Sequence, residues 1–299
     1  MGEMNQYILF TVDLEDWFQV ENLKPGISRA SWSSRELRVE KNTHHILNIL
    51  DSIKQESGYG PSRATFFVLG WIAERLPRLV REIHSRGYEV ASHGYSHQCC
   101  YDFPPDEVKK DLLDSKNLLE DIIGDRVDGY RAPSFSINDD VLKIIESCGY
   151  SYDSSYNSFS ANRRYGQIQF AGCPTEGISV KISDSFSELP ISNLHWKNIV
   201  LPWGGGGYFR LIPPGLFCKG VKSILKREGA YVFYVHPWEI DPDQPRVNAI
   251  PVSYRFRHYV NLGRTQQKIS SLLSHMERCC FVSCRTYLDL IKRTEDGVG

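Results

Sequence analysis

Short apolar runs alternate along the chain with longer stretches in which apolar residues recur every three or four positions. Residues 7–12 form an apolar run of the kind expected for a parallel strand that is buried on both faces. Residues 39–57 carry apolar side chains at helical spacing and predict the first long helix. Further strands are predicted at 63–69, 88–92, 127–131, 149–153, 230–235 and 281–283, and further helices at 72–86, 104–124, 138–145, 213–228, 265–277 and 287–292.

This alternation of strands and helices predicts an α/β fold with a parallel sheet. The periodicity fades between residues 157 and 212, where Gly, Ser and Asn are frequent, and we expect hairpins and substrate loops there. The four glycines at 204–207 are not followed by the Lys-Ser/Thr of a phosphate-binding loop, so we expect them to form a turning wall of a cleft. No linker or break in composition divides the chain, which favours one domain over residues 1–299.

Composition and charge narrow the range of partners. The 299 residues are 41% hydrophobic and 24% charged, which is typical of a globular protein, and the net charge is −1. Such a balance gives no general attraction to nucleic acid, so we expect none as a partner. No apolar stretch reaches the ~20 residues of a membrane span, and residues 1–6 lack the features of a signal peptide. We therefore expect a cytoplasmic location. The oligomeric state stays open.

The strongest polar residues all follow predicted strands directly. Asp13 ends the first strand, His93 and His97 lie in the loop after the third, Arg131 ends the fourth, and His236 follows the strand at 230–235. In a barrel of alternating strands and helices, the loops at the carboxyl ends of the strands converge on one active site. Each of these residues alone has an ordinary structural explanation. Their shared position at strand ends indicates a common site.

A metal centre is one chemistry that these residues could support. Two histidines four residues apart can turn toward one point, and a nearby carboxylate would complete a three-ligand site with one position open for water. Glu15 and Asp16 are the carboxylates that follow Asp13 most closely. An H-x-x-x-H pair by itself is weak support for metal binding. The crowding of three carboxylates at one strand end, however, is costly unless a cation offsets it.

Four segments resemble, in the correct order, the motifs of the NodB-type polysaccharide deacetylases, carbohydrate esterase family four. These segments are Thr11-Val12-Asp13, Ser92-His93-x-x-x-His97, Tyr130-Arg131-Ala132-Pro133 and His236-Pro237. The resemblance spans residues 7–240, and residues 241–299 would be an extension that completes the barrel. Residues 17–18, 65–71 and 255–265 further resemble the branch of the family found with bacterial exopolysaccharide synthesis.

The resemblance implies a distorted (β/α) barrel, usually of seven strands, that holds a divalent metal, most commonly Zn²⁺. The implied activity is removal of acetyl groups from N-acetylated sugars, with an N-acetylated saccharide as the partner. Asp13 would be the general base and Arg131 the residue that orients it. His93 and His97 would be metal ligands, and His236 would be the general acid.

The sequence departs from the family at one metal ligand. Many members place an Asp directly after the base, whereas this chain has Leu14. Glu15 or Asp16 must then supply the carboxylate ligand, and an acid-x-acid version of the motif among relatives slightly favours Glu15. The fourth family motif is also not distinct in this chain. Three residues are candidates for it: Asp153, Glu188 and Trp196.

Three functions are consistent with the sequence. The favoured one is a metal-dependent hydrolase that removes N-acetyl groups from a saccharide. The second is a hydrolase of the same fold that acts on a small cyclic amide or ureide, with or without a metal, and Leu14 at the usual ligand position is consistent with it. The third is a carbohydrate-binding protein without activity. Aromatic residues in the predicted rim loops could contact a sugar: Trp17, Phe18, Trp203, Tyr208, Phe209 and Trp238.

Overall fold

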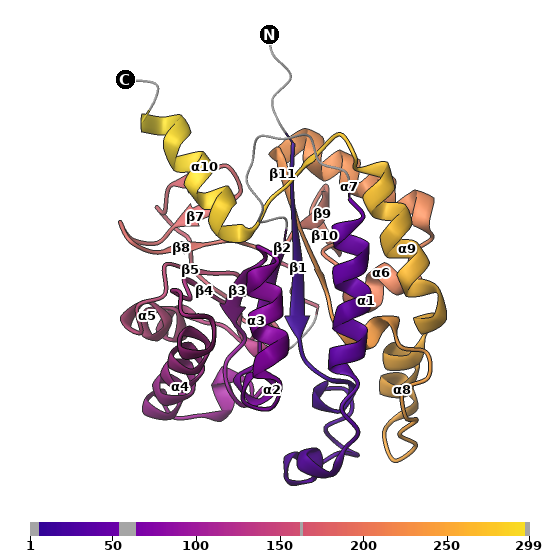
Figure 1. Cartoon of the computed structure of the whole chain (residues 1–299). Helices are drawn as coiled ribbons and strands as arrows, with labels where there is room; N and C mark the ends of the chain where they lie inside the picture. The colour runs from indigo at the N-terminus through magenta and orange to yellow at the C-terminus, as the bar shows by residue number, and fades with distance from the viewer. Residues whose placement is uncertain (1–5, 54–63, 162–163, 297–299) are drawn as a thin grey trace.

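A curled parallel sheet forms the centre of the molecule (Figure 1). The computed structural model describes residues 6–53, 64–161 and 164–296. Within these residues no strand pairing joins β8 to β11, so the sheet is an open half-barrel, which confirms the predicted distorted (β/α) barrel. The parallel strands, in sheet order, are β11 (Ala230–Val235), β1 (Tyr7–Leu14), β2 (Ala64–Val68), β3 (Glu89–Ser92), β4 (Gly129–Tyr130), β5 (Tyr152–Asp153) and β8 (Ser187–Glu188).

The remaining strands lie at the margins of this sheet. Strands β6 (Thr175–Glu176) and β7 (Ser179–Lys181) extend it beyond β8 with antiparallel pairing. Strands β9 (Asn193–Trp196) and β10 (Ile199–Pro202) form a separate hairpin. The last strand, β12 (Cys280–Phe281), pairs with the start of β1. The stretch at 157–212 therefore contains the hairpins that its composition predicted.

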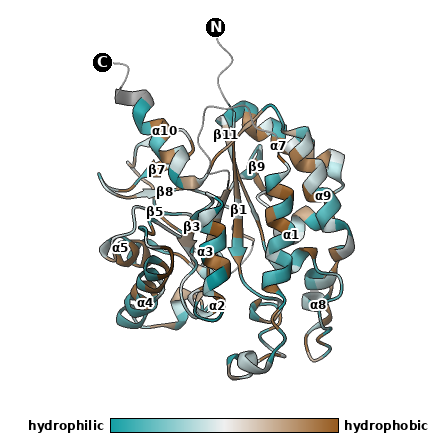
Figure 2. Ribbon diagram, in the orientation of Figure 1, coloured by the Kyte–Doolittle hydropathy of each residue, from teal (hydrophilic) through white to brown (hydrophobic). Residues whose placement is uncertain are grey.

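Helices cover the outer face of the sheet, and Figure 2 shows both apolar and polar residues on the long helices α1, α4 and α9. Helix α1 illustrates the pattern, because it buries Ile46, Leu47 and Leu50 against the sheet. Among the described residues, no helix combines the length and apolar character needed to cross a bilayer. The helices are α1 (Val39–Asp51), α2 (Gly70–Arg75), α3 (Pro77–Ser85), α4 (Pro105–Ile123), α5 (Asp139–Ser147), α6 (Gly206–Leu211), α7 (Pro214–Glu228), α8 (Val252–Tyr259), α9 (Leu262–His275) and α10 (Cys284–Asp296).

Several helices differ from the sequence-based expectation. The helix predicted over 72–86 is divided into α2 and α3, because Pro77 disfavours the helical conformation of the residue before it, and Leu76 adopts φ −125° and ψ 52°. Helices α6 and α8 were not predicted. The helix expected over 39–57 ends at Asp51, and positions 54–57 lie outside the described residues.

The alternation of side chains along β1 explains how the first carboxylate enters the barrel. The even-numbered residues from Ile8 to Leu14 belong to the core beneath the helices, whereas Leu9 belongs to a second core inside the barrel. Thr11 and Asp13 share the odd positions with Leu9 and therefore point inward. Leu14 points toward the helices, so it does not occupy a ligand position in this chain.

Candidate active site

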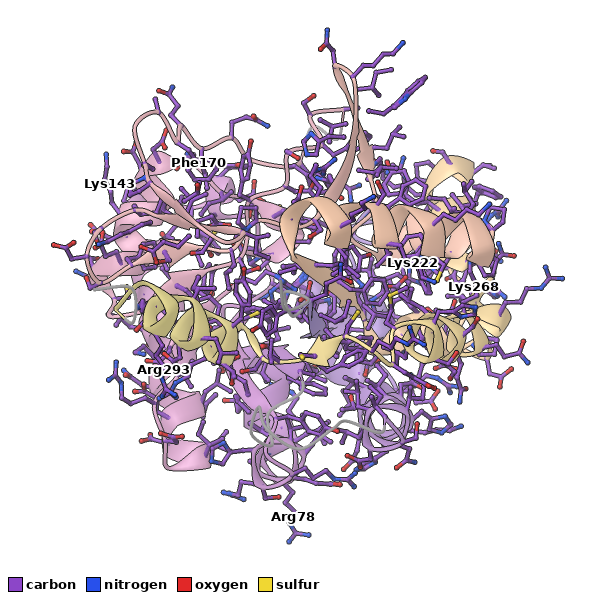
Figure 3. All side chains as sticks on the ribbon, turned by 90° about the horizontal axis from the view of Figure 1, so that it is seen from above. Arg78, Lys143, Phe170, Lys222, Lys268 and Arg293 are labelled. Atoms are coloured by element: carbon purple, nitrogen blue, oxygen red, sulfur yellow. The ribbon has the colours of Figure 1, made fainter. Side chains whose placement is uncertain are left out.

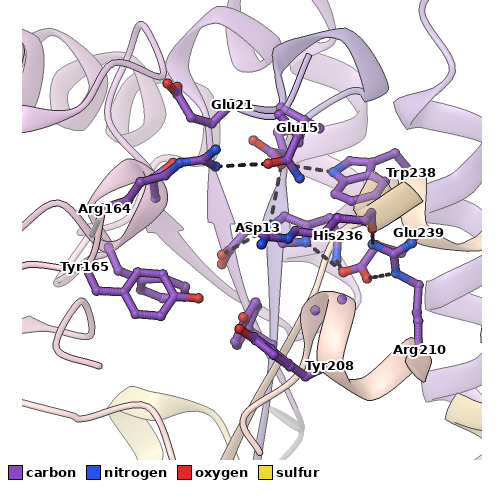
Figure 4. Close-up of a pocket in the computed structure, with 18 of the residues that line it drawn as sticks. Asp13, Glu15, Glu21, Arg164, Tyr165, Tyr208, Arg210, His236, Trp238 and Glu239 are labelled. Atoms are coloured by element: carbon purple, nitrogen blue, oxygen red, sulfur yellow. Dashed lines mark hydrogen bonds and ion pairs between the residues drawn. The ribbon is translucent and has the colours of Figure 1, made fainter. Parts of the chain in front are cut away.

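The polar residues that follow the strands meet at one mouth of the half-barrel, at the lower end of β1 in Figure 1. A cavity of about 400 Å³ opens there. Its lining includes Asp13, Glu15, His93, His97 and His236, which come from segments far apart in the sequence. Figure 4 shows three of them, Asp13, Glu15 and His236, close together. Four of these five were expected at a common site because of their places after strands.

Arg131 holds Asp13 in place beneath this cavity. The guanidinium donates from one nitrogen to Asp13 Oδ1 and to Thr11 Oγ1, both at 2.7 Å. Its other nitrogens donate to the carbonyl and hydroxyl of Ser154, each at 2.9 Å. Arg131 is 0% exposed, so its charge is compensated within the protein and mainly by Asp13. One oxygen of the Asp13 carboxylate is thus fixed, and the other faces the cavity.

Glu15, His93 and His97 form a compact group beside Asp13. One carboxylate oxygen and one nitrogen from each imidazole lie within 4.8 Å of one another, and all three side chains are buried. Glu15 Oε2 contacts His97 Nε2, and Glu15 Oε1 accepts a hydrogen bond from Trp238 Nε1 at 2.9 Å. This group is the set of His and carboxylate residues that the sequence analysis sought.

Neighbouring groups orient the two histidines. His93 Nδ1 lies 2.8 Å from the Arg131 carbonyl, which can only accept, so Nδ1 carries the proton and the other nitrogen turns toward Glu15. The loop itself is tied to α4, because Asp111 accepts hydrogen bonds from the backbone N–H groups of Tyr95 and Ser96. Asp111 is a positioning residue that the sequence analysis missed.

Asp16 lies outside the cluster, although it directly follows Glu15. One of its oxygens accepts from the N–H of Trp17 and caps the short helix η1 (Trp17–Gln19). The other oxygen accepts from the N–H groups of Arg38 and Val39 at the start of α1. Both oxygens are thus engaged in local backbone structure. The proposal of Asp16 as a metal ligand does not agree with this position, and Glu15 is the carboxylate of the cluster.

His236 faces the cluster from the opposite side of the cavity. Its Nε2 lies 3.6 Å from Glu15 Oε1 and 3.8 Å from Asp13 Oδ2. Its Nδ1 lies 2.8 Å from Glu239 Oε1, and Glu239 Oε2 accepts from Arg210 Nε at 2.7 Å (Figure 4). Glu239 and Arg210 were not predicted. The spacing of Glu239, three residues after a strand-end histidine, was a signal for it, but Arg210 left no such signal.

The charges in this cavity shift the protonation of the histidines in opposite directions. Burial lowers the pKa of His93 to about 4, which keeps this imidazole neutral. Burial opposes the protonation of His236 as well, but the charges of Glu15 and Glu239 outweigh it and raise its pKa to about 9. Burial would raise the pKa of Glu15, yet its histidine neighbours hold that pKa below its usual value.

The residues in this group fit a divalent metal ion. A neutral His93, a second imidazole and a carboxylate are the ligand set that catalytic zinc sites use, and three protein ligands leave one position open. Two buried atoms of the group lack a regular hydrogen bond: Glu15 Oε2, which contacts only His97 Nε2, and His97 Nδ1. A buried carboxylate oxygen without a donor is costly unless a cation or a protonated neighbour compensates it. Glu15, His93 and His97 are therefore the residues that would hold the metal.

Of the three candidates for the fourth motif, two lie together on neighbouring strands and do not line the cavity. Asp153 and Glu188 are opposite each other in the paired strands β5 and β8, and both are 0% exposed. Burial and the charge of Asp153 raise the pKa of Glu188 well above its usual value. Trp196 is 60% exposed on the β9–β10 hairpin and does not line the cavity.

Aromatic side chains form part of the cavity wall, but few of the expected ones take part. Tyr208 and Trp238 line the cavity, together with Gly206 and Gly207 of the glycine run. Phe135, Tyr165 and Tyr234 add to this wall without having been predicted. The other expected aromatics are buried in the core: Trp17, Phe18, Trp203 and Phe209.

His258 packs behind the cavity wall, and burial shifts its pKa. Its ring stacks on Trp238 with centroids 4.5 Å apart, and its Nε2 contacts Gln244 Oε1 at 2.7 Å. Burial, together with the charge of Arg210, lowers the pKa of His258 to about 3. The unfolded chain, with an ordinary pKa near 6.5, therefore binds this proton first as the pH falls.

We expect the free energy of unfolding to fall by about 2 kcal/mol between pH 7 and pH 5 because of His258. The loss begins below the unfolded pKa of about 6.5 and is complete near pH 3. Denaturant unfolding of the wild type and of His258→Gln at both pH values measures this contribution as the difference between their pH slopes. His275→Gln, at an exposed position of α9, is the control. Equal slopes for wild type and His258→Gln would contradict the prediction.

The fold and the site together define the class of protein: an open (β/α) barrel in which carboxylates, histidines and a buried arginine meet at one mouth. Comparison with known protein families narrows this class to one family for part of the chain. Residues 38–152 match the model of the polysaccharide deacetylases, and residues 154–289 match a domain of unknown function (DUF3473). Residues 38–152 therefore form a polysaccharide deacetylase domain of the NodB type, carbohydrate esterase family four.

Curated relatives of this family align with part of the chain. A peptidoglycan deacetylase-like protein of Gibberella zeae is 34% identical over 121 residues, which are 40% of this chain and 34% of the relative. A peptidoglycan-N-acetylglucosamine deacetylase of Bacillus cereus is 30% identical over 108 residues, which are 36% of this chain and 47% of the relative. The chain thus spans between a third and a half of the length of these relatives.

Solved structures share the fold over nearly the whole chain. A Mycobacterium smegmatis protein that is assigned as a polysaccharide deacetylase has 18% identity and a TM-score of 0.60, with coverage of 99% of this chain and 93% of its own. An allantoinase has 14% identity and a TM-score of 0.57, with coverage of 98% and 91%. At these identities the likeness shows the fold alone.

Proposed function

We propose that this protein is a metal-dependent hydrolase that removes N-acetyl groups from an N-acetylated saccharide. The observation that carries the proposal is the meeting of Asp13, Arg131, His236 and the Glu15–His93–His97 group at one cavity. Amide hydrolysis needs a base for the attacking water, stabilisation of the carbonyl oxygen and an acid for the departing amine. The cavity contains a candidate for each role.

Asp13 is the candidate base. Arg131 occupies its Oδ1, which keeps the carboxylate in one orientation and leaves Oδ2 to accept the proton of a water molecule. A divalent ion held by Glu15, His93 and His97 would lower the pKa of water and polarise the acetyl carbonyl. Zinc is the ion that this ligand set favours most.

His236 is the candidate acid. Glu239 accepts the proton of Nδ1 and fixes the ring, so that Nε2 points into the cavity. The charge on Glu239 also favours the protonated ring, and Arg210 keeps Glu239 ionised by lowering its pKa against the effect of burial. A protonated His236 at this position can donate from Nε2 to the nitrogen of the departing amine.

Acetate release tests the function directly. The purified chain, supplied with one equivalent of Zn²⁺, is incubated with oligosaccharides of N-acetylglucosamine, and acetate and free amine are measured. We expect both products in equal amounts and no product after removal of metal with a chelator. A chain that binds zinc and these sugars without releasing acetate would point to a carbohydrate-binding protein.

His97→Ala should weaken zinc binding by more than about 100-fold. Loss of a residue that only hydrogen-bonds to a metal ligand already weakens binding by about 10- to 100-fold, and loss of the ligand itself should cost more. Calorimetric titration with Zn²⁺ measures this loss without any substrate. His45→Ala, at an exposed position of α1, is the matched control and should bind zinc as the wild type does. Unchanged affinity in His97→Ala would remove His97 from the metal site.

The other two functions receive less support. The cyclic amide or ureide alternative is supported only by the fold that this chain shares with the allantoinase, at 14% identity. The relatives that align by sequence carry names of peptidoglycan deacetylases, which favours an N-acetylated glycan as the substrate class. A role in exopolysaccharide synthesis is part of our proposal and is supported by the resemblance at residues 17–18, 65–71 and 255–265. We further propose that residues 1–299 act as one catalytic domain, because both family matches contribute strands to one sheet.

A further inference from the structure

One long segment near the cavity contains basic residues and no acidic ones. Between Gln244 and Met276 the chain has no Asp or Glu, whereas the whole protein carries 36 acidic and 35 basic residues. The segment includes α8 and α9. Its basic side chains are Arg246, Arg255, Arg257, Arg264 and Lys268. The segment therefore concentrates positive charge in a molecule that is almost neutral.

Helix α8 brings this charge to the mouth of the catalytic cavity, where Figure 1 places the helix near the carboxyl end of β1. Ser253, Phe256 and Arg257 of α8 line that cavity. Phe256 also lines a second hollow of about 470 Å³, which thus adjoins the first. We call this second hollow the α8 groove, and define it by Arg246, Asn248, Val252, Arg255, Phe256 and Tyr259.

The positive charges of the α8 groove have no acidic partner within the described part of the chain. No carboxylate of the described residues lies within 4 Å of Arg246 or Arg255 in an ion pair. Arg210 and Lys268 are different, since Arg210 pairs with buried Glu239 and Lys268 donates to backbone carbonyls at the end of α6. A hollow lined by charges of one sign attracts ligands of the opposite sign.

The aromatic side chains of the groove suit a sugar ring. The guanidinium of Arg246 lies 4.3 Å from the centre of the Tyr259 ring, and the Tyr259 hydroxyl is held by the N–H of Val247 and the carbonyl of Pro245. Phe256 is 60% exposed at the boundary between the two hollows. Rings with fixed orientation can stack on a pyranose, while the planar guanidinium groups recognise a carboxylate through paired hydrogen bonds.

We propose that the α8 groove binds a carboxylate-bearing sugar of the saccharide whose N-acetylated residue enters the catalytic cavity. The substrate class is then an acidic polysaccharide in which uronic acid residues accompany N-acetylated ones. Arg246 and Arg255 bind the carboxylate, and Phe256 and Tyr259 contact the sugar ring. This inference rests on the proposed function, because it takes the cavity as the site of the acetylated sugar.

Binding of two saccharides of equal length tests the proposal. Hyaluronan oligosaccharides alternate glucuronate with N-acetylglucosamine, and oligosaccharides of chitin contain N-acetylglucosamine alone. Calorimetry with the full chain at low salt should show hyaluronan binding at least about tenfold more tightly, with an advantage that shrinks as salt is added. Equal affinity for the two saccharides would overturn the proposal.

Variants locate the effect in the groove. Arg246→Gln/Arg255→Gln should weaken hyaluronan binding at least about tenfold and leave chitin oligosaccharide binding unchanged. Arg78→Gln removes a charge on α3, where Figure 3 shows the side chain projecting from the surface, and should change neither affinity. Thermal unfolding checks that the double variant is folded. A double variant that binds hyaluronan like Arg78→Gln would overturn the assignment.

Two further results distinguish the possible explanations. If vesicles of phosphatidylglycerol bind through Arg246 and Arg255 while hyaluronan binding does not need them, the groove contacts a lipid surface and the proposal is wrong. If hyaluronan binding depends on both arginines but no acetate is released from any saccharide, the groove assignment holds and the proposed activity fails. In both cases binding alone decides the groove assignment, and acetate release separately decides the proposed activity.

Discussion

Asp13→Asn should lower the rate of acetate release by about a thousandfold, within the range that a positioned general base contributes. The amide oxygen of asparagine can still accept the hydrogen bond from Arg131 that Asp13 Oδ1 accepts at 2.7 Å. The amide nitrogen, however, cannot accept a proton from water. The side chain keeps its shape while the base is lost, so we expect kcat to fall far more than KM changes. Steady-state kinetics on N-acetylglucosamine oligosaccharides measures this.

Two controls separate the loss of a base from other effects. Asp184→Asn makes the same chemical change at a fully exposed position and should leave the rate unaltered. Zinc binding by Asp13→Asn should stay close to that of the wild type, since Glu15, His93 and His97 are unchanged. The charge of Arg131 is less well compensated in the variant, so its unfolding is measured and assays are done well below its Tm. Full activity in a folded Asp13→Asn would show that Asp13 is not the base.

Arg131→Met should destabilise the fold by about 3–5 kcal/mol, the usual cost of removing one partner of a buried ion pair. Arg131 is 0% exposed and links Asp13 and Thr11 of β1 to Ser154 after β5. The methionine fills part of the space but leaves the Asp13 carboxylate buried without its cation. Denaturant unfolding measures the change in free energy. Because this link crosses the barrel interior, we expect activity to be lost as well.

A matched replacement shows whether the effect belongs to this buried position. Arg126→Met removes an arginine whose side chain is 71% exposed and pairs with Asp128 at 3.1 Å. Exposed pairs contribute about 0–1 kcal/mol, so this variant should unfold close to the wild type. If Arg131→Met were as stable as Arg126→Met, Arg131 would not be the residue that organises the site.

Much of the fold followed from local pattern. The buried run at the start of the chain became β1, and the alternation of strands and helices became the parallel sheet. Short strands were harder to place. β8 contains only Ser187 and Glu188, and two residues are too few to show a periodicity, yet they complete the run of parallel strands. Helix α8 was missed because apolar and basic residues mix along it without a clear apolar stripe.

The candidate site was predictable where each side chain directly follows a strand. Asp13, His93, Arg131 and His236 were chosen for that reason, and the structure brings them to one mouth. Residues that only hold a site residue in position were not predictable in the same way. Arg210 lies on α6 and reaches the site only through Glu239. Contacts of this kind depend on how a distant helix packs, which no local pattern in the sequence records.

The sequence by itself determined the order of the helices and strands and the residue types at the strand ends. The spacing of apolar residues and the residues that end helices and strands are local properties of the chain. Only the tertiary structure decided between Glu15 and Asp16. These neighbours have the same charge and follow the same strand, but the chain turns between them. Glu15 meets the two imidazoles, while Asp16 is drawn to the free N–H groups at the starts of η1 and α1. The choice thus depended on partners that are distant in the sequence and near only after folding.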